Sequence, residues 1–182
     1  MNLFTRRIEM DLKAIENKLR QVPGFPEEGV NFIDITTALQ DGETLRAIID
    51  HMIEAVSDLE IDVVVGSESR GFIMGTPMAY ALGVGFVPVR KPGRLPAETV
   101  SIDYDLEYGS NTLELHKDAI KPGEKVLVVD DLLATGGTAN ASCKLVEELG
   151  GEVVATSFFI ELEGLGGRKA LEGYRIETLL NM

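Results

Sequence analysis

Runs of consecutive apolar residues alternate with amphipathic helical patterns along this chain, and this alternation restricts the fold more than any other feature. Helical spacing and apolar runs predict helices over 44–56, 72–82 and 138–149 and strands over 61–65, 84–89, 126–129 and 153–160. Strands that lack polar alternation are buried on both faces, which is typical of parallel sheets. We therefore predict an α/β fold with a central, mostly parallel sheet flanked by helices.

Two segments depart from this rhythm. Apolar residues over 8–22 follow helical spacing and predict an amphipathic helix that ends before Pro23 and Gly24. Between about 92 and 118, apolar residues from Val100 to Leu106 alternate with polar ones, a turn cluster follows, and Leu113 and Leu115 resume the alternation. This pattern predicts a β-hairpin at the edge of the sheet, long enough to act as a lid.

The composition limits the class of protein. A chain of 182 residues with 45% hydrophobic content predicts a single domain over 1–182. The 17 basic and 30 acidic residues give a net charge of −13, which argues against binding to nucleic acid or to a membrane surface. The single cysteine, Cys143, excludes an intramolecular disulfide, and no apolar run resembles a signal peptide or a membrane span, so we expect a cytoplasmic protein.

One segment carries most of the chemical information. The predicted strand 126–129 is followed by the acid pair Asp130 and Asp131, and a Thr135-Gly136-Gly137-Thr138 turn then opens the next helix. Glycines in such a turn let backbone N–H groups converge on an anion at the helix N-terminus. The loop lacks the lysine of a triphosphate-binding loop, so a single phosphate suits it better. Paired carboxylates require hydroxyl donors or a cation, and a ribose diol or a divalent metal supplies them.

This segment resembles the signature of the type I phosphoribosyltransferases, which have a hydrophobic strand, two acids and a Thr-Gly-Gly-Thr loop. The resemblance implies that Asp130 and Asp131 hold the ribose hydroxyls of phosphoribosyl pyrophosphate. It also implies a loop that binds the 5-phosphate, consisting of Ala134, Thr135, Gly136, Gly137 and Thr138.

Further motifs are similar to those of the adenine phosphoribosyltransferases, from about Phe25 to Leu171. They are Phe25-Pro26, Gly29-Val30, Asp34-Ile35, Ser69-Arg70-Gly71-Phe72, Val89-Arg90-Lys91 and Leu106-Glu107-Tyr108-Gly109. The resemblance implies that residues 1–35 contribute a helix and a small hood over adenine, and that 36–182 form the α/β core. In the hood, Phe32 would stack on the base, and main-chain groups near Asn31 and Ile33 would bind it. Arginine is frequent in the family at position 33, so isoleucine is a departure there.

The leaving pyrophosphate requires cations, and Arg70, Arg90, Lys91 and Arg94 follow two predicted strand ends. The resemblance implies that they bind it, with Arg90 and Arg94 acting across the interface of a homodimer. It also implies Glu107 as the general acid/base, with Tyr108 ordering the lid.

Magnesium is the expected cofactor, held through substrate oxygens rather than by a dedicated cage. His51 and His116 lie far apart in the sequence and are interpreted as structural or surface residues.

Two alternatives remain open from the sequence. One is a phosphoribosyltransferase for xanthine, hypoxanthine or guanine, which would share the phosphate loop and differ in its hood. The other is a regulator that only senses phosphoribosyl pyrophosphate, although that protein would require a DNA-binding domain, for which about 25 N-terminal residues are too few.

Overall fold

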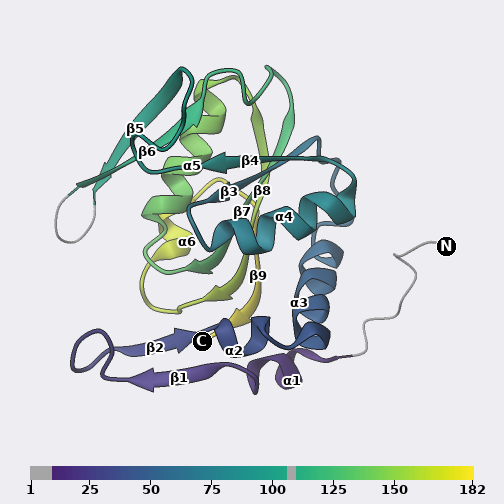
Figure 1. Cartoon of the computed structure of the whole chain (residues 1–182), viewed down its shortest axis with the longest axis vertical. Helices are drawn as coiled ribbons and strands as arrows, with labels where there is room; N and C mark the ends of the chain where they lie inside the picture. The colour runs from purple at the N-terminus through teal and green to yellow at the C-terminus, as the bar shows by residue number, and fades with distance from the viewer. Residues whose placement is uncertain (1–9, 106–109) are drawn as a thin grey trace. The chain divides into compact units, whose positions relative to one another are not determined.

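The computed structural model describes residues 10–105 and 110–182 of the chain (Figure 1). They belong to two compact units, of which the first ends at His51 and the second begins at Met52. The single domain over 1–182 stays a prediction. Within the described residues, no helix has both the length and the apolar character needed to cross a membrane.

The first unit contains short elements and an antiparallel strand pair. Their bounds are α1 Leu12–Glu16, β1 Arg20–Pro23, β2 Asn31–Asp34 and α2 Thr36–Leu39, followed by α3 Gly42–Glu54, which continues past the end of the unit. The carboxylate of Asp11 caps α1 by accepting the Ala14 N–H at 2.7 Å. Strands β1 and β2 pair from Arg20 opposite Asp34 to Pro23 opposite Asn31.

The helix predicted over 8–22 is wrong for most of its described length. Only Leu12–Glu16 is helical, and Val22 lies in β1 opposite Phe32. Helical spacing is a local signal, whereas the backbone hydrogen bonds of β1 come from a strand about ten residues further along the chain. That non-local pairing overrides the local pattern, and the sequence pattern of 8–22 does not reveal it.

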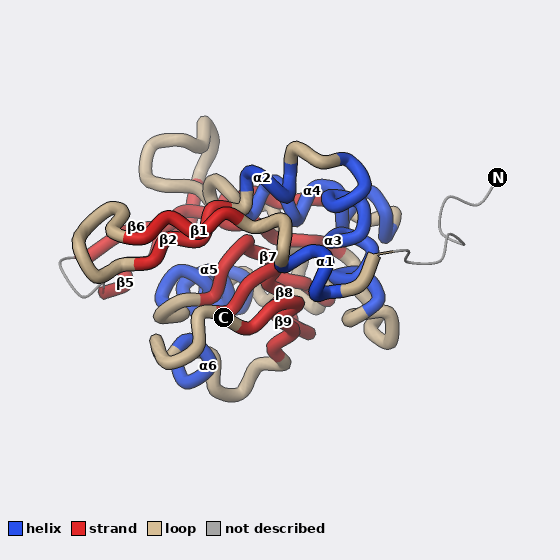
Figure 2. The backbone as a smooth tube through the Cα atoms, turned by 90° about the horizontal axis from the view of Figure 1, so that it is seen from below, coloured by secondary structure: helices blue, strands red, loops and turns tan. Residues whose placement is uncertain are grey.

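The second unit is built on a five-stranded sheet in the order β4-β3-β7-β8-β9, with every neighbouring pair parallel. Figure 2 shows β7, β8 and β9 side by side. The strands are β3 Val63–Ser67, β4 Gly85–Val89, β7 Lys125–Leu133, β8 Glu152–Glu161 and β9 Ile176–Asn181. The predicted parallel sheet is therefore confirmed, and its central strands are buried along almost their whole length, as their apolar runs require.

Helices cover both faces of this sheet. They are α4 Gly71–Leu82, α5 Gly137–Glu148 and the short α6 Gly167–Ala170. Val63 and Val65 pack in one cluster with Cys143 of α5, whereas Val64 lies against Gly75 of α4. Because successive side chains of a strand point to opposite faces, α4 and α5 lie on opposite sides of the sheet.

The predicted β-hairpin is present. Strands β5 Thr99–Asp105 and β6 Ser110–His116 pair antiparallel over their full length, from Thr99 opposite His116 to Asp105 opposite Ser110. Arg90 at the end of β4 forms an isolated bridge with Glu114 of β6, which connects the hairpin to the sheet. The residues that join the two strands, 106–109, lie outside the described residues, and the lid function stays a prediction.

Candidate active site

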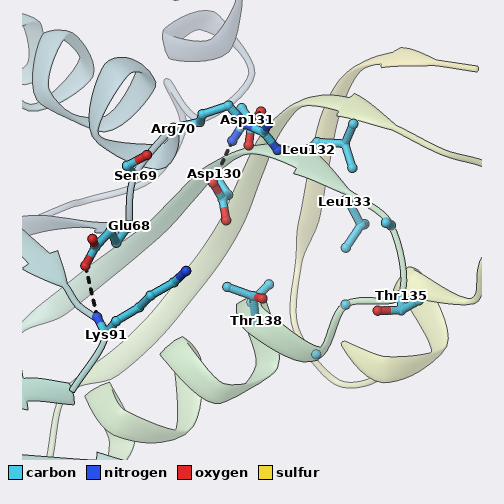
Figure 3. Close-up of a pocket in the computed structure, with 14 residues that line it drawn as sticks. Glu68, Ser69, Arg70, Lys91, Asp130, Asp131, Leu132, Leu133, Thr135 and Thr138 are labelled. Atoms are coloured by element: carbon cyan, nitrogen blue, oxygen red, sulfur yellow. Dashed lines mark hydrogen bonds and ion pairs between the residues drawn. The ribbon is translucent and has the colours of Figure 1, made fainter. Parts of the chain in front are cut away.

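The ends of three neighbouring strands form one pocket of about 380 Å³ (Figure 3). Strands β4, β3 and β7 are adjacent and parallel, so their carboxyl ends meet at the same edge of the sheet. The pocket is lined by Glu68, Ser69 and Arg70 after β3, by Lys91 after β4, and by Asp130, Asp131, Leu132, Leu133, Ala134, Thr135, Gly136, Gly137, Thr138 and Ala139. The geometry thus brings together the predicted acid pair, the whole predicted phosphate loop and two of the four predicted cations.

The sequence predicted the acid pair just after the end of a strand, but both acids lie inside β7. The strand continues to Leu133, since its backbone keeps pairing with β8 as far as Glu161. Asp131 is 5% exposed and forms an ion pair with Arg70, whose Nε lies 2.5 Å from its Oδ2. The charge of Asp131 is therefore compensated within the pocket wall.

Asp130 has a different electrostatic environment. Burial, and next the neighbouring Asp131 carboxylate, raise the pKa of Asp130 well above the ordinary value, and Arg70 offsets only part of this effect. Its Oδ1 accepts the backbone N–H of Asp131 at 2.9 Å. A carboxylate in this position is costly to ionise and gains from any ligand that supplies hydroxyl donors or positive charge.

The loop after β7 leads into α5 without a side-chain cap. Gly136 has φ +82°, in the left-handed region that glycine adopts without strain, and it precedes the first helical residue, Gly137. Gly136 has no side chain to cap the helix, so the N–H groups of the first turn are available to a ligand. Thr135 is exposed and Thr138 is half-buried, and both hydroxyls belong to pocket-lining residues.

The loop rests on α6, a contact that the sequence analysis missed. A Cβ atom on Gly136 would lie 2.7 Å from the Gly167 carbonyl oxygen, and one on Gly167 would lie 2.5 Å from that of Ala134. Arg168 holds α6 in place, since its Nε donates to both carboxylate oxygens of Glu161 at 2.9 Å. The Gly166-Gly167 pair was the available signal, because adjacent glycines mark sites of close backbone approach.

The predicted cations fall into two groups. Arg70 and Lys91 line the pocket, and in Figure 3 the Lys91 side chain extends into the space bordered by Asp130 and Thr138. Arg90 is not among the lining residues: its Nε donates to Glu68 at 2.9 Å and its guanidinium lies 5.8 Å from the centre of the Phe72 ring. Arg94 is exposed. Pyrophosphate binding by any of the four stays a prediction.

Glu68 lines the pocket, although no sequence motif had indicated it. It accepts hydrogen bonds from Arg90 and from the backbone N–H of Lys91 at 3.0 Å, and these two bonds lower its pKa. Glu68 therefore stays ionised and joins the loops that follow β3 and β4.

The predicted base-binding residues lie together on β2 in the first unit. The ring of Phe32 packs edge-to-face against Phe25 at 5.3 Å between ring centres, Ile33 is buried, and the Asn31 amide donates to Gln21 at 3.2 Å. Their role in binding adenine stays a prediction. Glu107 and Tyr108 lie outside the described residues, so the predicted acid/base and lid functions are also untested.

Neither histidine belongs to the pocket. His51 Nε2 lies 2.9 Å from the Met10 carbonyl oxygen, and His116 Nε2 accepts the backbone N–H of Ala97 at 3.4 Å. Among residues 10–105 and 110–182, no three histidine, cysteine or acidic side chains are arranged to hold a metal ion. Each histidine thus makes a local contact with the backbone, and the interpretation of both as structural or surface residues stays a prediction.

Comparison with known proteins agrees with this geometry. The phosphoribosyl transferase domain family model matches residues 36–177. A relative from Alkaliphilus oremlandii named adenine phosphoribosyltransferase is 58% identical over 171 residues, which cover 94% of this chain and 98% of the relative. The crystal structure of adenine phosphoribosyltransferase from Thermoanaerobacter pseudethanolicus has a TM-score of 0.92 and 50% identity, and the match covers 94% of this chain and all of that one.

The adenine phosphoribosyltransferase of Saccharomyces cerevisiae, crystallised with adenine and an imino-altritol bisphosphate, has a TM-score of 0.87 and 42% identity. Its match covers 92% of this chain and 97% of the yeast chain. Family model, sequence relatives and solved structures therefore agree over nearly the whole length. This chain belongs to the phosphoribosyltransferase family and, within it, to the adenine phosphoribosyltransferases.

Proposed function

We propose that this chain transfers the 5-phosphoribosyl group of phosphoribosyl pyrophosphate to adenine, giving AMP and pyrophosphate. The observation that carries this proposal is the pocket itself, in which an acid pair, an uncapped helix N-terminus and two cations surround about 380 Å³. These three groups match the ribose hydroxyls, the 5-phosphate and the pyrophosphate of one substrate. The crystallised yeast relative with bound adenine supports the choice of base.

The pocket residues divide the substrate between them. The backbone N–H groups at the start of α5, with the hydroxyls of Thr135 and Thr138, bind the 5-phosphate. Asp130 and Asp131 accept hydrogen bonds from the two ribose hydroxyls. This binding also relieves Asp130, because hydroxyl donors stabilise a carboxylate that is otherwise costly to ionise in the pocket.

At the reacting centre, N9 of adenine forms a bond to the anomeric carbon as the bond from that carbon to the pyrophosphate oxygen breaks. Negative charge then develops on the pyrophosphate, and Arg70 and Lys91 stabilise it from the wall of the pocket. Arg90 and Arg94 add positive charge from across the interface of a homodimer. The N9 proton, or the proton relayed through N7, passes to Glu107, the proposed general base.

Magnesium is the proposed cofactor. The donor set suits it, since Mg²⁺ prefers one or two carboxylates together with substrate phosphates and water. Asp130 is the fitting carboxylate, because Asp131 already pairs with Arg70. When bound, the ion supplies positive charge that neutralises the departing pyrophosphate.

The hood supplies the base site. Phe32 stacks on the adenine ring, and main-chain groups near Asn31 and Ile33 hydrogen-bond to its edge. Adenine is uncharged, so an aromatic surface and backbone groups are adequate for it. The exposed apolar residues Ile73 and Tyr80 of α4 support a homodimer. A cytoplasmic location fits the substrate, which is a phosphorylated polyanion unable to cross a membrane.

The test is pyrophosphate release from phosphoribosyl pyrophosphate and Mg²⁺, measured separately with adenine, hypoxanthine, guanine and xanthine. We expect release with adenine alone. Preference for a 6-oxopurine would contradict the assignment of the base and leave the phosphate site intact. Binding of phosphoribosyl pyrophosphate without release for any base would instead favour the sensing regulator.

A further inference from the structure

A hydrogen bond connects the hairpin to the phosphate loop and has no part in the function proposed so far. The hydroxyl of Tyr104, on β5, lies 3.1 Å from Oγ1 of Thr138, in the first turn of α5. Tyr104 is half-buried, and its ring packs on the hydrophobic cluster beside Val100 and Ile102. The ring of Tyr104 therefore contributes to packing, whereas its hydroxyl contributes a separate hydrogen bond to Thr138.

Thr138 is held from a second side. Its carbonyl oxygen accepts the hydroxyl of Ser142 at 2.9 Å, and Ser142 lies 3.2 Å from the hydroxyl of Ser67 at the end of β3. Ser67 and Ser142 are both completely buried. Since the one hydroxyl hydrogen of Ser142 goes to Thr138, Ser67 is the donor to Ser142. The backbone of Thr138 is thus fixed to the sheet, and the orientation of its hydroxyl is left to Tyr104.

The direction of the Tyr104 hydrogen bond decides what Thr138 offers the pocket. A threonine hydroxyl has one hydrogen to donate and two lone pairs to accept. If Thr138 donates to Tyr104, only lone pairs face the pocket, and they repel a phosphate. If Tyr104 donates, the hydrogen of Thr138 is free for the anion. A phosphate in the loop selects the second arrangement.

From this geometry we infer that Tyr104 is a positioning residue for the 5-phosphate, which orients the Thr138 hydroxyl and ties the hairpin to an occupied phosphate loop. This inference rests on the proposed function, because it takes the α5 loop as the phosphate site. It also joins two parts of the fold, because a phosphate bound in the loop restrains β5, the strand that carries Tyr104.

The first test is Tyr104→Phe, which keeps the ring and removes the hydroxyl. We expect the Kd of ribose 5-phosphate and the KM of phosphoribosyl pyrophosphate to rise about three- to tenfold, the range of one lost hydrogen bond. The phosphate is bound both before and during transfer, so kcat and the KM of adenine should change less than about twofold. Pyrophosphate binding should be unaffected, because the loop does not hold it.

Tyr174→Phe is the matched control. Tyr174 also packs against the cluster, and its hydroxyl donates to Glu147 near the other end of α5 at 2.8 Å. Loss of that hydroxyl should leave ribose 5-phosphate binding unchanged. An equal loss of affinity in both tyrosine variants would overturn the inference, as would unchanged binding in Tyr104→Phe.

A double-mutant cycle with Thr138→Ala separates positioning from packing. In the Thr138→Ala background, Tyr104→Phe should have no further effect on ribose 5-phosphate affinity, because there is no hydroxyl left to orient. A loss of the same size in both backgrounds would show that Tyr104 acts through packing. If the wild-type protein forms no AMP, the proposed function fails, whereas the ribose 5-phosphate measurement still decides the inference by itself.

Discussion

At the scale of single residues, the pocket places two neighbouring acids in unlike environments. Asp131 is buried and paired with Arg70, whereas Asp130 is half-buried and lies beside a second carboxylate that raises its pKa. The charge of Asp130 is only partly offset in the ligand-free protein, so keeping this acid for ligand binding lowers the stability of the fold. Neutralising the two acids should therefore have opposite effects on stability.

Asp130→Asn should abolish transfer and stabilise the ligand-free protein at neutral pH. The folded state holds the Asp130 proton more tightly than the unfolded chain does, because its pKa is raised from 3.8. This group therefore costs no stability below pH 3.8, and the cost grows as pH rises toward the raised pKa. Thermal unfolding should show a Tm gain for the variant that increases with pH in that range, about 2–4 °C for each kcal/mol relieved.

Asp131→Asn is the control for this prediction. It removes the partner of Arg70 and should lower Tm rather than raise it, because the half-exposed guanidinium loses the buried carboxylate with which it pairs. A Tm gain of equal size in both variants, or a gain in Asp130→Asn that does not depend on pH, would contradict the electrostatic explanation.

Glu107 is predicted to act on the proton of adenine rather than on its affinity. Glu107→Gln should lower kcat by about 100-fold or more, the usual contribution of a general base, with little change in the Kd of adenine. Steady-state kinetics and equilibrium binding of adenine measure the two quantities separately. A parallel loss of both would make Glu107 a base-recognition residue instead.

Among the helices and strands, those that depend on a local sequence pattern were predicted correctly. Those that depend on contacts between residues far apart in the sequence were missed. The parallel strands, α4 and α5 follow from apolar periodicity, and the phosphate loop and acid pair occupy one contiguous segment. The strand pair β1–β2 and the position of α6 depend on contacts between distant residues. Glu68 joins the site for the same reason, since β4 brings Arg90 and Lys91 to it.

The support that α6 gives to the phosphate loop has a direct test. A methyl group in Gly167→Ala would lie 2.5 Å from the Ala134 carbonyl oxygen and 2.7 Å from Cγ of Leu133, so the loop must move. We expect a destabilisation of about 1–3 kcal/mol, as in other overpacked sites. The KM of phosphoribosyl pyrophosphate should also rise more than that of adenine.

Gly85→Ala provides the comparison for the α6 variant. A Cβ atom there would meet only Cγ2 of Val63, at an ordinary 3.7 Å, and this glycine has no left-handed φ. Chemical denaturation and steady-state kinetics of both variants separate loop displacement from the general effect of adding a methyl group. If Gly167→Ala matched Gly85→Ala in both, α6 would have no part in shaping the loop.

At the scale of the whole molecule, one helix face suggests a second copy of the chain. Ile73 and Tyr80 lie two turns apart on α4 and are 43% and 78% exposed. Large apolar side chains at that spacing form one surface stripe, which is typical of an interface. The adjacent end of β4 leads to Arg90 and Arg94, the two arginines expected to act across the homodimer.

The combined substitution Ile73→Glu and Tyr80→Glu should therefore convert a dimer into a monomer. Sedimentation should give the wild-type protein twice the 19.8 kDa mass of one chain and the variant a single one. The Leu12→Glu variant, which changes a similarly exposed apolar residue on α1, should remain dimeric.

The monomeric variant also tests whether the active site is shared between the two chains. If it loses transfer while its circular dichroism is unchanged, each active site requires groups from the partner chain. A monomeric wild type would refute the dimer and return Arg90 and Arg94 to a role within their own chain.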